Sequence, residues 1–280
     1  DIFCFNVESA VELEIINELA ATKNKVASIA LRINPEVDAH THAKITTGMK
    51  ENKFGINLSQ LGGVLDKLKE MKNVKLIGIH SHIGSQITDM SSFRNLVIRF
   101  NEIQEELEAH GVTVENLNFG GGLGIDYYHP NHLSIPAFDN YFAAIHKLLQ
   151  VRPGQQVHFE PGRSIVAQCG TLISKVLYVK EGETKKFAIL DAGFTELTRP
   201  AMYDAYHRIE NISSDEAVET YDVVGPICES SDVFGKDVEL NKAHRGDLIA
   251  LRSAGAYGEV MASQYNCRHL PKAYYSDTIK

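Results

Sequence analysis

Hydrophobic and polar positions along the first 165 residues predict strands and helices in alternation. Five short apolar runs have the length and residue types of buried strands, at residues 2–7, 26–34, 74–80, 112–119 and 155–159. Four intervening segments carry apolar residues three or four positions apart and are predicted helices, at residues 11–19, 59–71, 93–107 and 135–149. Such alternation is typical of a parallel sheet, as in a (β/α) barrel or a doubly wound fold.

Clusters of polar residues and glycines follow the later predicted strands. Residues 80–86 follow the third strand, residues 118–127 follow the fourth, and residues 160–163 follow the fifth. In barrels and open parallel sheets the functional groups gather at the carboxyl ends of the strands. The pattern therefore predicts a functional site at this end of the sheet.

The segment after the fourth strand contains three successive glycines, Gly120 to Gly122. Glycines leave backbone N–H groups uncovered and tolerate positive φ, as a main chain wrapped around a phosphate requires. The spacing matches neither the dinucleotide fingerprint nor a P-loop. A glycine run after a strand is more often a tight turn than a ligand site, so the segment alone leaves both interpretations open.

The pattern changes after Arg163. Several apolar and β-branched runs read as strands without regular helices between them, at residues 169–179, 186–191, 221–224, 238–240 and 247–253. We therefore expect a (β/α) barrel portion at residues 1–168 and a mostly β domain at residues 169–280. A closed barrel has eight strand–helix units and only about five are found, so we expect the later strands of a barrel, with an open sheet as the less favoured alternative.

Composition and charge narrow the classes of partner. The 280 residues are 44% hydrophobic and carry a net charge of -8, which permits a substantial core but offers no basic field for nucleic acid or an anionic membrane. No apolar run approaches the length of a membrane span. The four cysteines are scattered, and the amino end has no signal-peptide pattern. These features favour a reduced, cytoplasmic protein that acts on a small molecule.

Two pairs of alternating histidines raise the question of a metal site. His40 and His42 lie in a polar loop, where we expect them to be solvated. His80 and His82 stand at a strand end, where two such residues can ligate a metal. A metal-dependent hydrolase on a (β/α) barrel is therefore an alternative, although no further cluster completes a ligand set. We expect at most one of His80 and His82 to contact a ligand.

Seven motifs, in order, resemble the diaminopimelate decarboxylases of the alanine-racemase-like (fold type III) family of pyridoxal-phosphate decarboxylases. They are Lys53-Phe-Gly55, His80-Ser-His-Ile-Gly-Ser85, Gly120-Gly-Gly-Leu-Gly124, Glu160-Pro-Gly-Arg163, Arg199-Pro-Ala-Met-Tyr203, Cys228-Glu-Ser230 and Ala254-Gly-Ala-Tyr257. The resemblance covers essentially the whole chain. It implies a barrel followed by a β domain, and a homodimer in which Cys228 and Glu229 reach into the partner's site.

The resemblance implies pyridoxal 5′-phosphate as the cofactor. It places the ring nitrogen against Glu160, which would keep that nitrogen protonated, and the ring face against His82. The other implied cofactor-binding residues, several of them around the phosphate, are Ser85, Gly120, Gly121, Gly122, Gly162, Arg163 and Tyr257. The family's cofactor-binding lysine belongs to an early barrel strand in a Lys-Ala-Asn context. That context does not occur here, so no lysine of this chain takes the role.

The resemblance also implies an amino-acid substrate, surrounded by Arg163, Arg199, Tyr203, Glu229 and Tyr257. Arginine suits a carboxylate because its planar fork donates two parallel hydrogen bonds, and Glu229 suits an ammonium group. Cys228 is the implied proton donor after CO2 departs. These residues favour decarboxylation of meso-2,6-diaminopimelate to L-lysine and CO2, the last step of lysine biosynthesis.

Plainer interpretations remain open for the same residues. A cysteine such as Cys228 is more often a small buried hydrophobe, and Tyr257 beside glycines suits a core ring. Glu160 could simply end a strand, and Arg163 could form a weak surface ion pair. The alternative activities are decarboxylation of ornithine, arginine or carboxynorspermidine. A non-catalytic fragment or binding-only relative is a further alternative, suggested by the missing lysine.

Overall fold

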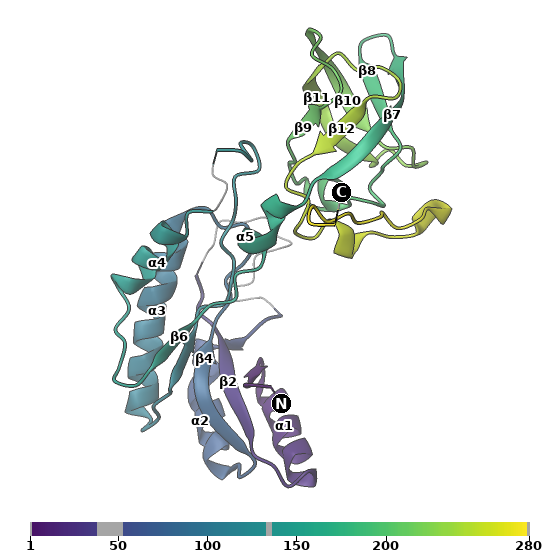
Figure 1. Cartoon of the computed structure of the whole chain (residues 1–280). Coiled ribbons are helices and arrows are strands. Elements are labelled where there is room, and N and C mark those ends of the chain that lie inside the picture. Colours follow the sequence, from purple (N-terminus) through teal and green to yellow (C-terminus); the bar gives the residue numbers. More distant parts are fainter. Residues whose placement is uncertain (1, 38–52, 133–135, 279–280) are drawn as a thin grey trace. The chain divides into compact units, whose positions relative to one another are not determined.

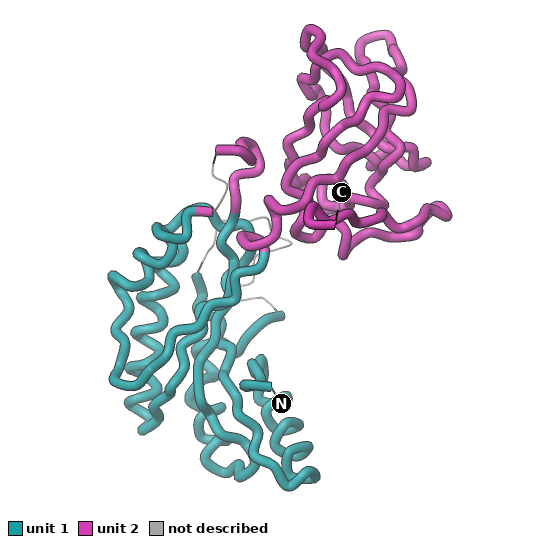
Figure 2. Tube along the Cα trace, viewed as in Figure 1, with its two compact units in different colours: residues 1–124, 137–162 teal, residues 125–136, 163–280 magenta. Residues whose placement is uncertain are grey.

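Buried hydrophobic residues collect in two main cores, and the chain divides into two units (Figures 1 and 2). The computed structural model describes residues 2–37, 53–132 and 136–278. Unit 1 comprises Asp1–Gly124 and Ala137–Gly162, and unit 2 comprises Ile125–Pro136 and Arg163–Lys280. The division at residues 168 and 169 stays a prediction, and the loop with His40 and His42 lies outside the described residues.

Unit 1 is a parallel sheet with helices between its strands (Figure 1). Its strands are β1 (Phe5–Val7), β2 (Ala27–Asn34), β3 (Ile56–Asn57), β4 (Val74–His80), β5 (Asn116–Asn118) and β6 (Gln156–His158). Its helices are α1 (Ala10–Thr22), α2 (Leu58–Glu70), α3 (Met90–Ala109) and α4 (Phe138–His146). The sheet order is β1-β2-β4-β5-β6, with β3 paired to β2.

The register of the sheet brings the ends of three strands to one level. His80 of β4 lies opposite Asn118 of β5, and Asn118 lies opposite His158 of β6. All these pairs are parallel, so the segments that follow β4, β5 and β6 leave the sheet at the same edge. The expectation that the polar clusters follow the carboxyl ends of neighbouring strands is confirmed.

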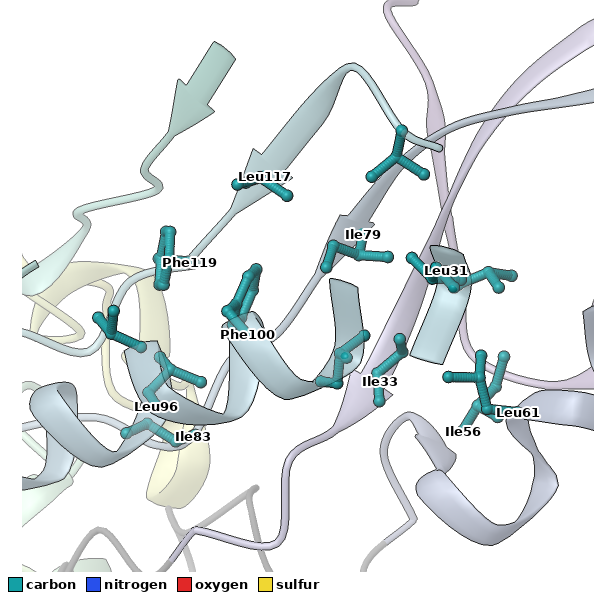
Figure 3. Close-up of a cluster of buried hydrophobic side chains, with 14 of the residues drawn as sticks. Leu31, Ile33, Ile56, Leu61, Ile79, Ile83, Leu96, Phe100, Leu117 and Phe119 are labelled. Carbon is teal, nitrogen blue, oxygen red and sulfur yellow. The ribbon is translucent and has the colours of Figure 1, made fainter. Parts of the chain in front are cut away.

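Helix α3 shows why these residues form the predicted elements. The Asp89 side chain accepts a hydrogen bond from the Ser91 N–H at 2.8 Å and so caps the first turn. The helix ends at a turn in which Gly111 has a φ of +74°. On its buried face, Phe100 stacks on Phe119 with ring centroids 4.1 Å apart, as Figure 3 illustrates. Burial of each such ring stabilises the fold by about 2 kcal/mol and fixes the start of the glycine segment.

Unit 2 is mostly β structure. Its strands are β7 (Leu172–Glu181), β8 (Lys186–Leu190), β9 (Ile209–Asn211), β10 (Val218–Val224), β11 (Val233–Asn241) and β12 (Leu248–Leu251). They form one sheet in the order β11-β10-β8-β7-β12-β9, in which only the β8–β10 pair is parallel. The helices are the short α5 (Arg163–Val166) and α6 (Arg199–Tyr203). Among its described residues, 3-10 turns cover Ala167–Cys169, Glu259–Met261 and Tyr265–Cys267.

The bounds of several predicted elements differ from those observed. Strand β4 has the predicted bounds, but β5 contains only three of the eight expected residues. The Val112 N–H instead donates to the Leu107 carbonyl in the turn that ends α3, so it is not available to the sheet. In the described part of the chain, no helix is long and apolar enough to cross a membrane.

Candidate active site

The glycine segment of unit 1 lies directly against the two neighbouring loops. The Gly121 N–H donates to Nδ1 of His82 at 3.1 Å, and the Glu160 N–H donates to the Gly120 carbonyl at 2.8 Å. A Cβ at position 120 would lie 2.5 Å from the Ser81 carbonyl oxygen, and one at position 121 would lie 2.3 Å from the Glu160 carbonyl oxygen. Any side chain there would displace backbone, so the close approach of these loops requires glycine.

Backbone conformation adds a second requirement for glycine. Gly120 has a φ of +62° and Gly122 a φ of +108°, in the region that L side chains rarely adopt. The segment is fixed further by the Ile87 N–H, which donates to the Gly122 carbonyl at 2.9 Å. Successive main-chain groups in such a turn can form an anion-binding concavity.

Glu160 carries an ionised carboxylate at the end of β6. Its Oε2 lies 3.3 Å from Nε2 of His80, and its Oε1 accepts a hydrogen bond from Nδ2 of Asn118 at 2.9 Å. The hydrogen bond with His80 is the main cause that lowers the pKa of Glu160 to about 2. Nδ1 of His80 is buried and has no hydrogen-bond partner among the described residues. The Glu160 carboxylate is therefore held in place by His80 and Asn118 and is ionised at neutral pH.

His82 is a half-buried, neutral ring. Burial is the main cause that lowers its pKa to about 4, and the positive charge of Arg32 adds to the effect. Because Nδ1 accepts the Gly121 N–H, the ring proton belongs on Nε2. An uncharged ring fixed by the glycine segment suits stacking against a flat ligand.

Two further predicted cofactor residues lie in the same unit. Ser85 is half-buried in the loop that follows β4. Gly162 is exposed after Glu160, and a Cβ there would meet nothing within 4 Å. A side chain at position 162 would therefore meet no steric obstacle, in contrast to positions 120 and 121.

Unit 2 contains two buried arginines that converge on one tyrosine. Nη1 of Arg163 donates to the Tyr127 hydroxyl at 2.8 Å, while the Arg199 guanidinium lies 4.9 Å from the centroid of the Tyr127 ring. The exposed fractions of the two arginines are 6% and 5%. The Arg163 guanidinium also lies 5.0 Å from the ring centroid of Tyr257, which is partly exposed and has a φ of +59°. Burying two guanidinium groups together is costly unless an anion or strong acceptors face them.

His207 completes this group. Nη1 of Arg199 donates to Nε2 of His207 at 2.7 Å, and Nδ1 of His207 contacts the Arg252 carbonyl at 2.8 Å. Burial is the main cause that lowers the pKa of His207 to about 4 and also lowers that of Arg199. The Tyr127 ring meets the His207 ring edge-on, with centroids 5.2 Å apart.

The remaining predicted residues lie elsewhere in unit 2. Tyr203 is half-buried at the end of α6, the helix that Arg199 begins. Cys228 and Glu229 are exposed in the loop between β10 and β11, and within the described ranges their side chains make no hydrogen bond or ion pair. The structure thus groups Arg163, Arg199 and Tyr257, while Cys228 and Glu229 occupy a separate loop. Cys228 is exposed, so the plainer interpretation of this residue as a small buried hydrophobe is wrong.

Three residues with clear roles in these arrangements were not predicted from the sequence. Tyr127 ends the glycine segment and receives Arg163, and His207 receives Arg199. Asp232 is a buried carboxylate that accepts the N–H of Ile227, the residue before Cys228. The available signals were weak, namely a polar aromatic residue after the glycines and an aspartate four positions after the cysteine.

Comparisons with known proteins establish the family. The family model described as pyridoxal-dependent decarboxylase, pyridoxal binding domain, matches residues 1–167. A Bacteroides thetaiotaomicron protein named diaminopimelate decarboxylase is 66% identical over 278 residues, which cover 99% of this chain and 72% of that protein. The chain belongs to the diaminopimelate decarboxylase family. The Haemophilus influenzae diaminopimelate decarboxylase is 45% identical over 95% of this chain and 63% of its own length, so the chain spans roughly two thirds of these relatives.

Solved structures confirm the predicted fold class. The Helicobacter pylori diaminopimelate decarboxylase complexed with L-lysine is 41% identical, with a TM-score of 0.87 over 95% of this chain and 66% of that chain. The M. jannaschii diaminopimelate decarboxylase is also 41% identical, with a TM-score of 0.85 over 95% of this chain and 62% of that chain. The chain has the α/β barrel-type fold of this family, followed by the β-rich domain.

The residues of unit 1 fit the pyridoxal phosphate on which the family depends. The glycine cradle leaves no room for side chains, Glu160 stays ionised, and His82 is neutral. The two histidines of the suggested metal pair have other neighbours, because His80 contacts Glu160 and His82 contacts Gly121. Among the residues that the structure describes, no group of three or more His, Cys, Asp or Glu could hold a metal ion.

Proposed function

We propose that this protein decarboxylates meso-2,6-diaminopimelate to L-lysine and CO2 with pyridoxal phosphate, as the last step of lysine biosynthesis. The observation that carries the proposal is the ionised Glu160 beside the glycine cradle, in a chain 66% identical to a named diaminopimelate decarboxylase. The lysine complex of the H. pylori relative supports a site that accepts the product.

The cofactor residues have distinct tasks. When bound, pyridoxal phosphate supplies an electron sink for the electron pair released as CO2 departs. Glu160 holds a proton on the pyridine nitrogen, and the neutral His82 packs against the ring. Gly120 to Gly122 line the phosphate site and admit the phosphate by their lack of side chains, because the N–H groups of Gly120 and Gly121 donate to Asn118 and His82. The rest of the proposed set is Ser85, Gly162, Arg163 and Tyr257.

The substrate residues divide by charge. Arg199 and Arg163 bind carboxylates, because buried guanidinium groups favour an anion strongly and their planar forks match its geometry. Glu229 binds the ammonium group at the far end of the substrate, and Tyr203 and Tyr257 complete the set. Cys228 delivers the proton that replaces the departing carboxyl group.

Three broader features belong to the same proposal. The protein is a homodimer with shared sites, in which Cys228 and Glu229 serve the partner. It resides in the cytoplasm, a location supported by four cysteines that are all free. Residues 1–168 are the C-terminal portion of the cofactor-binding barrel and residues 169–280 are the β-rich domain, a division supported by the family match to residues 1–167.

A substrate panel tests the activity against its alternatives. The full-length protein, purified with pyridoxal phosphate, is given meso-diaminopimelate, ornithine, arginine or carboxynorspermidine, and CO2 release is measured. We expect release from meso-diaminopimelate well above the other three, because they lack its second zwitterionic end. Preferential release from ornithine, arginine or carboxynorspermidine would assign a different decarboxylase, and no release from any would support a binding-only relative.

A further inference from the structure

A buried carboxylate lies under the loop that carries Cys228 and Glu229. Asp232 is only 3% exposed, and its Oδ2 accepts the Ile227 N–H at 2.7 Å. Its Oδ1 accepts the Phe194 N–H, also at 2.7 Å. Ile227 directly precedes Cys228, and Phe194 lies in the segment that leads into α6 and its first residue, Arg199. One side chain thus joins the two segments that carry the proposed proton donor and the proposed substrate arginine.

Two glycines make room for this carboxylate. A Cβ at position 225 would lie 2.3 Å from Oδ2 of Asp232, and a Cβ at position 193 would lie 2.9 Å from Oδ1. The loop is also closed through the backbone, because the Gly225 N–H donates to the Asp232 carbonyl at 3.0 Å and the Asp232 N–H donates to the Glu229 carbonyl at 3.1 Å. Both ends of the Cys228 loop are therefore tied to Asp232.

The segment that leads to Arg199 has a second carboxylate of the same kind. Oε2 of Glu196 accepts the Gly193 N–H at 2.7 Å, and its Oε1 pairs with Arg268 at 2.9 Å. Consecutive N–H groups, of Gly193 and Phe194, thus donate to Glu196 and Asp232. The two carboxylates fix the start of this segment.

Burial of the ionised Asp232 side chain is unfavourable. Burial raises the pKa of its carboxyl group, the negative charge of Glu196 raises it further, and the N–H groups of Ile227 and Phe194 oppose that shift. Asp232 forms no ion pair within the described residues; its carboxylate is held mainly by main-chain groups. A neutral residue would be less unfavourable to bury, so the carboxylate indicates a geometric task rather than a contribution to stability.

We propose that Asp232 is a positioning residue that anchors the loop of Cys228 and Glu229 to the segment before Arg199, so that the loop keeps the geometry with which it serves the partner's site. This inference rests on the proposed decarboxylase function. Asparagine at position 232 preserves the volume but offers one acceptor oxygen, so its NH2 group faces an N–H donor and one of the two contacts is lost. The loop then loses one anchor while the core remains filled.

The test compares Asp232→Asn with Asp222→Asn in the full-length holoenzyme. Asp222 is the control, because it is 7% exposed on β10 and also accepts a main-chain N–H, that of Asp237 at 2.8 Å, although it differs from Asp232 in its ion pair with Lys185. We expect Asp232→Asn to lower kcat about 10- to 100-fold, since small displacements of reacting groups have effects of this size, and Asp222→Asn to stay within about twofold. Hydrogen exchange should quicken at residues 193–198 and 225–232 in Asp232→Asn alone.

Each outcome decides the matter. Unchanged exchange in both segments, or quickening of the same segments in Asp222→Asn, would overturn the inference. Quickened exchange with an unchanged kcat would reduce Asp232 to a structural residue and would also overturn it. If the unmodified protein releases no CO2 from meso-diaminopimelate, the proposed function fails, and the exchange comparison alone then decides whether Asp232 holds the two segments.

Discussion

Nη1 of Arg199 lies 2.7 Å from Nε2 of His207, and the arginine is necessarily the donor. Nε2 must therefore be unprotonated, which leaves the ring proton on Nδ1, where it is donated to the Arg252 carbonyl at 2.8 Å. Burial and the positive charges of Arg199 and Arg163 keep the pKa of His207 at about 4, so the ring is neutral at physiological pH. His207 thus orients a buried guanidinium group while adding no charge beside it.

Removal of this acceptor should weaken substrate binding. His207→Leu keeps the space filled but loses the bond to Arg199, and a hydrogen bond to a charged group contributes about 1.5–3 kcal/mol. We expect the KM for meso-diaminopimelate to rise about 10- to 100-fold with a smaller change in kcat. Steady-state kinetics of the holoenzyme measure both values. His158→Leu is the control, because the ring of His158 also makes one side-chain hydrogen bond, to Asn116. An equal effect of both variants would exclude a specific role.

The buried histidine also predicts a dependence of stability on pH. Its pKa falls from about 6.5 in the unfolded chain to about 4 in the folded protein, so the unfolded state binds more protons between these values. Stability is therefore complete above pH 6.5 and is lost as the pH falls toward 4. The loss from His207 between pH 7 and 4.5 should be about 2–3 kcal/mol. Urea unfolding at several pH values measures it, and a pH slope in His207→Leu equal to that of the unmodified protein would contradict the assignment.

The glycine cradle should not tolerate a methyl group. In Gly121→Ala the new Cβ would lie 2.3 Å from the Glu160 carbonyl oxygen, so the loops must separate. Overpacking of this kind costs about 1–3 kcal/mol, and the displaced glycine segment should bind the cofactor phosphate less well. Gly63→Ala in α2 is the matched control, because its Cβ meets nothing within 4 Å and alanine favours a helix. Thermal unfolding and titration with pyridoxal phosphate distinguish the two, and equal cofactor affinity would refute the cradle.

Glu160 should matter for chemistry more than for cofactor binding. Glu160→Gln keeps an acceptor for Asn118 but removes the negative charge that holds a proton on the pyridine nitrogen. We expect kcat to fall by about 100-fold or more, while the bound pyridoxal phosphate, measured by absorbance, stays within about twofold. Glu115→Gln, on an exposed residue at the opposite end of β5, should change neither value. Normal turnover in Glu160→Gln would show that the carboxylate has no such task.

The sequence predicted the parallel sheet and its polar edge better than the contacts within the site. Strand β4 was predicted with its observed bounds because apolar residues predominate from Val74 to Ile79 and polar residues begin at His80. Strand β9 was missed because Ile209–Asn211 has one apolar residue among three, and its pairing with β12 forms only in the folded protein.

The loops after β4, β5 and β6 were predictable as one edge because parallel strands order them. By contrast, His207 and Asp232 have their roles through contacts with residues distant in sequence, such as Arg252 and Phe194. No local pattern marks such contacts. The same holds for Tyr127, which receives Arg163 from 36 positions along the chain. The order of the motifs identified residues that could bind a ligand. The residues that hold those side chains in place could be identified only from the tertiary structure.

The most direct measurement is the yield of L-lysine from meso-diaminopimelate, with the full-length protein loaded with pyridoxal phosphate and assayed beside Cys228→Ala. Our account predicts equal amounts of lysine and CO2 from the unmodified protein. It also predicts turnover at least about 100-fold slower in Cys228→Ala, with the cofactor absorbance unchanged, because only the proton donor is removed. Absence of lysine from the unmodified protein would contradict the proposed function, and normal turnover in Cys228→Ala would place the proton donor elsewhere.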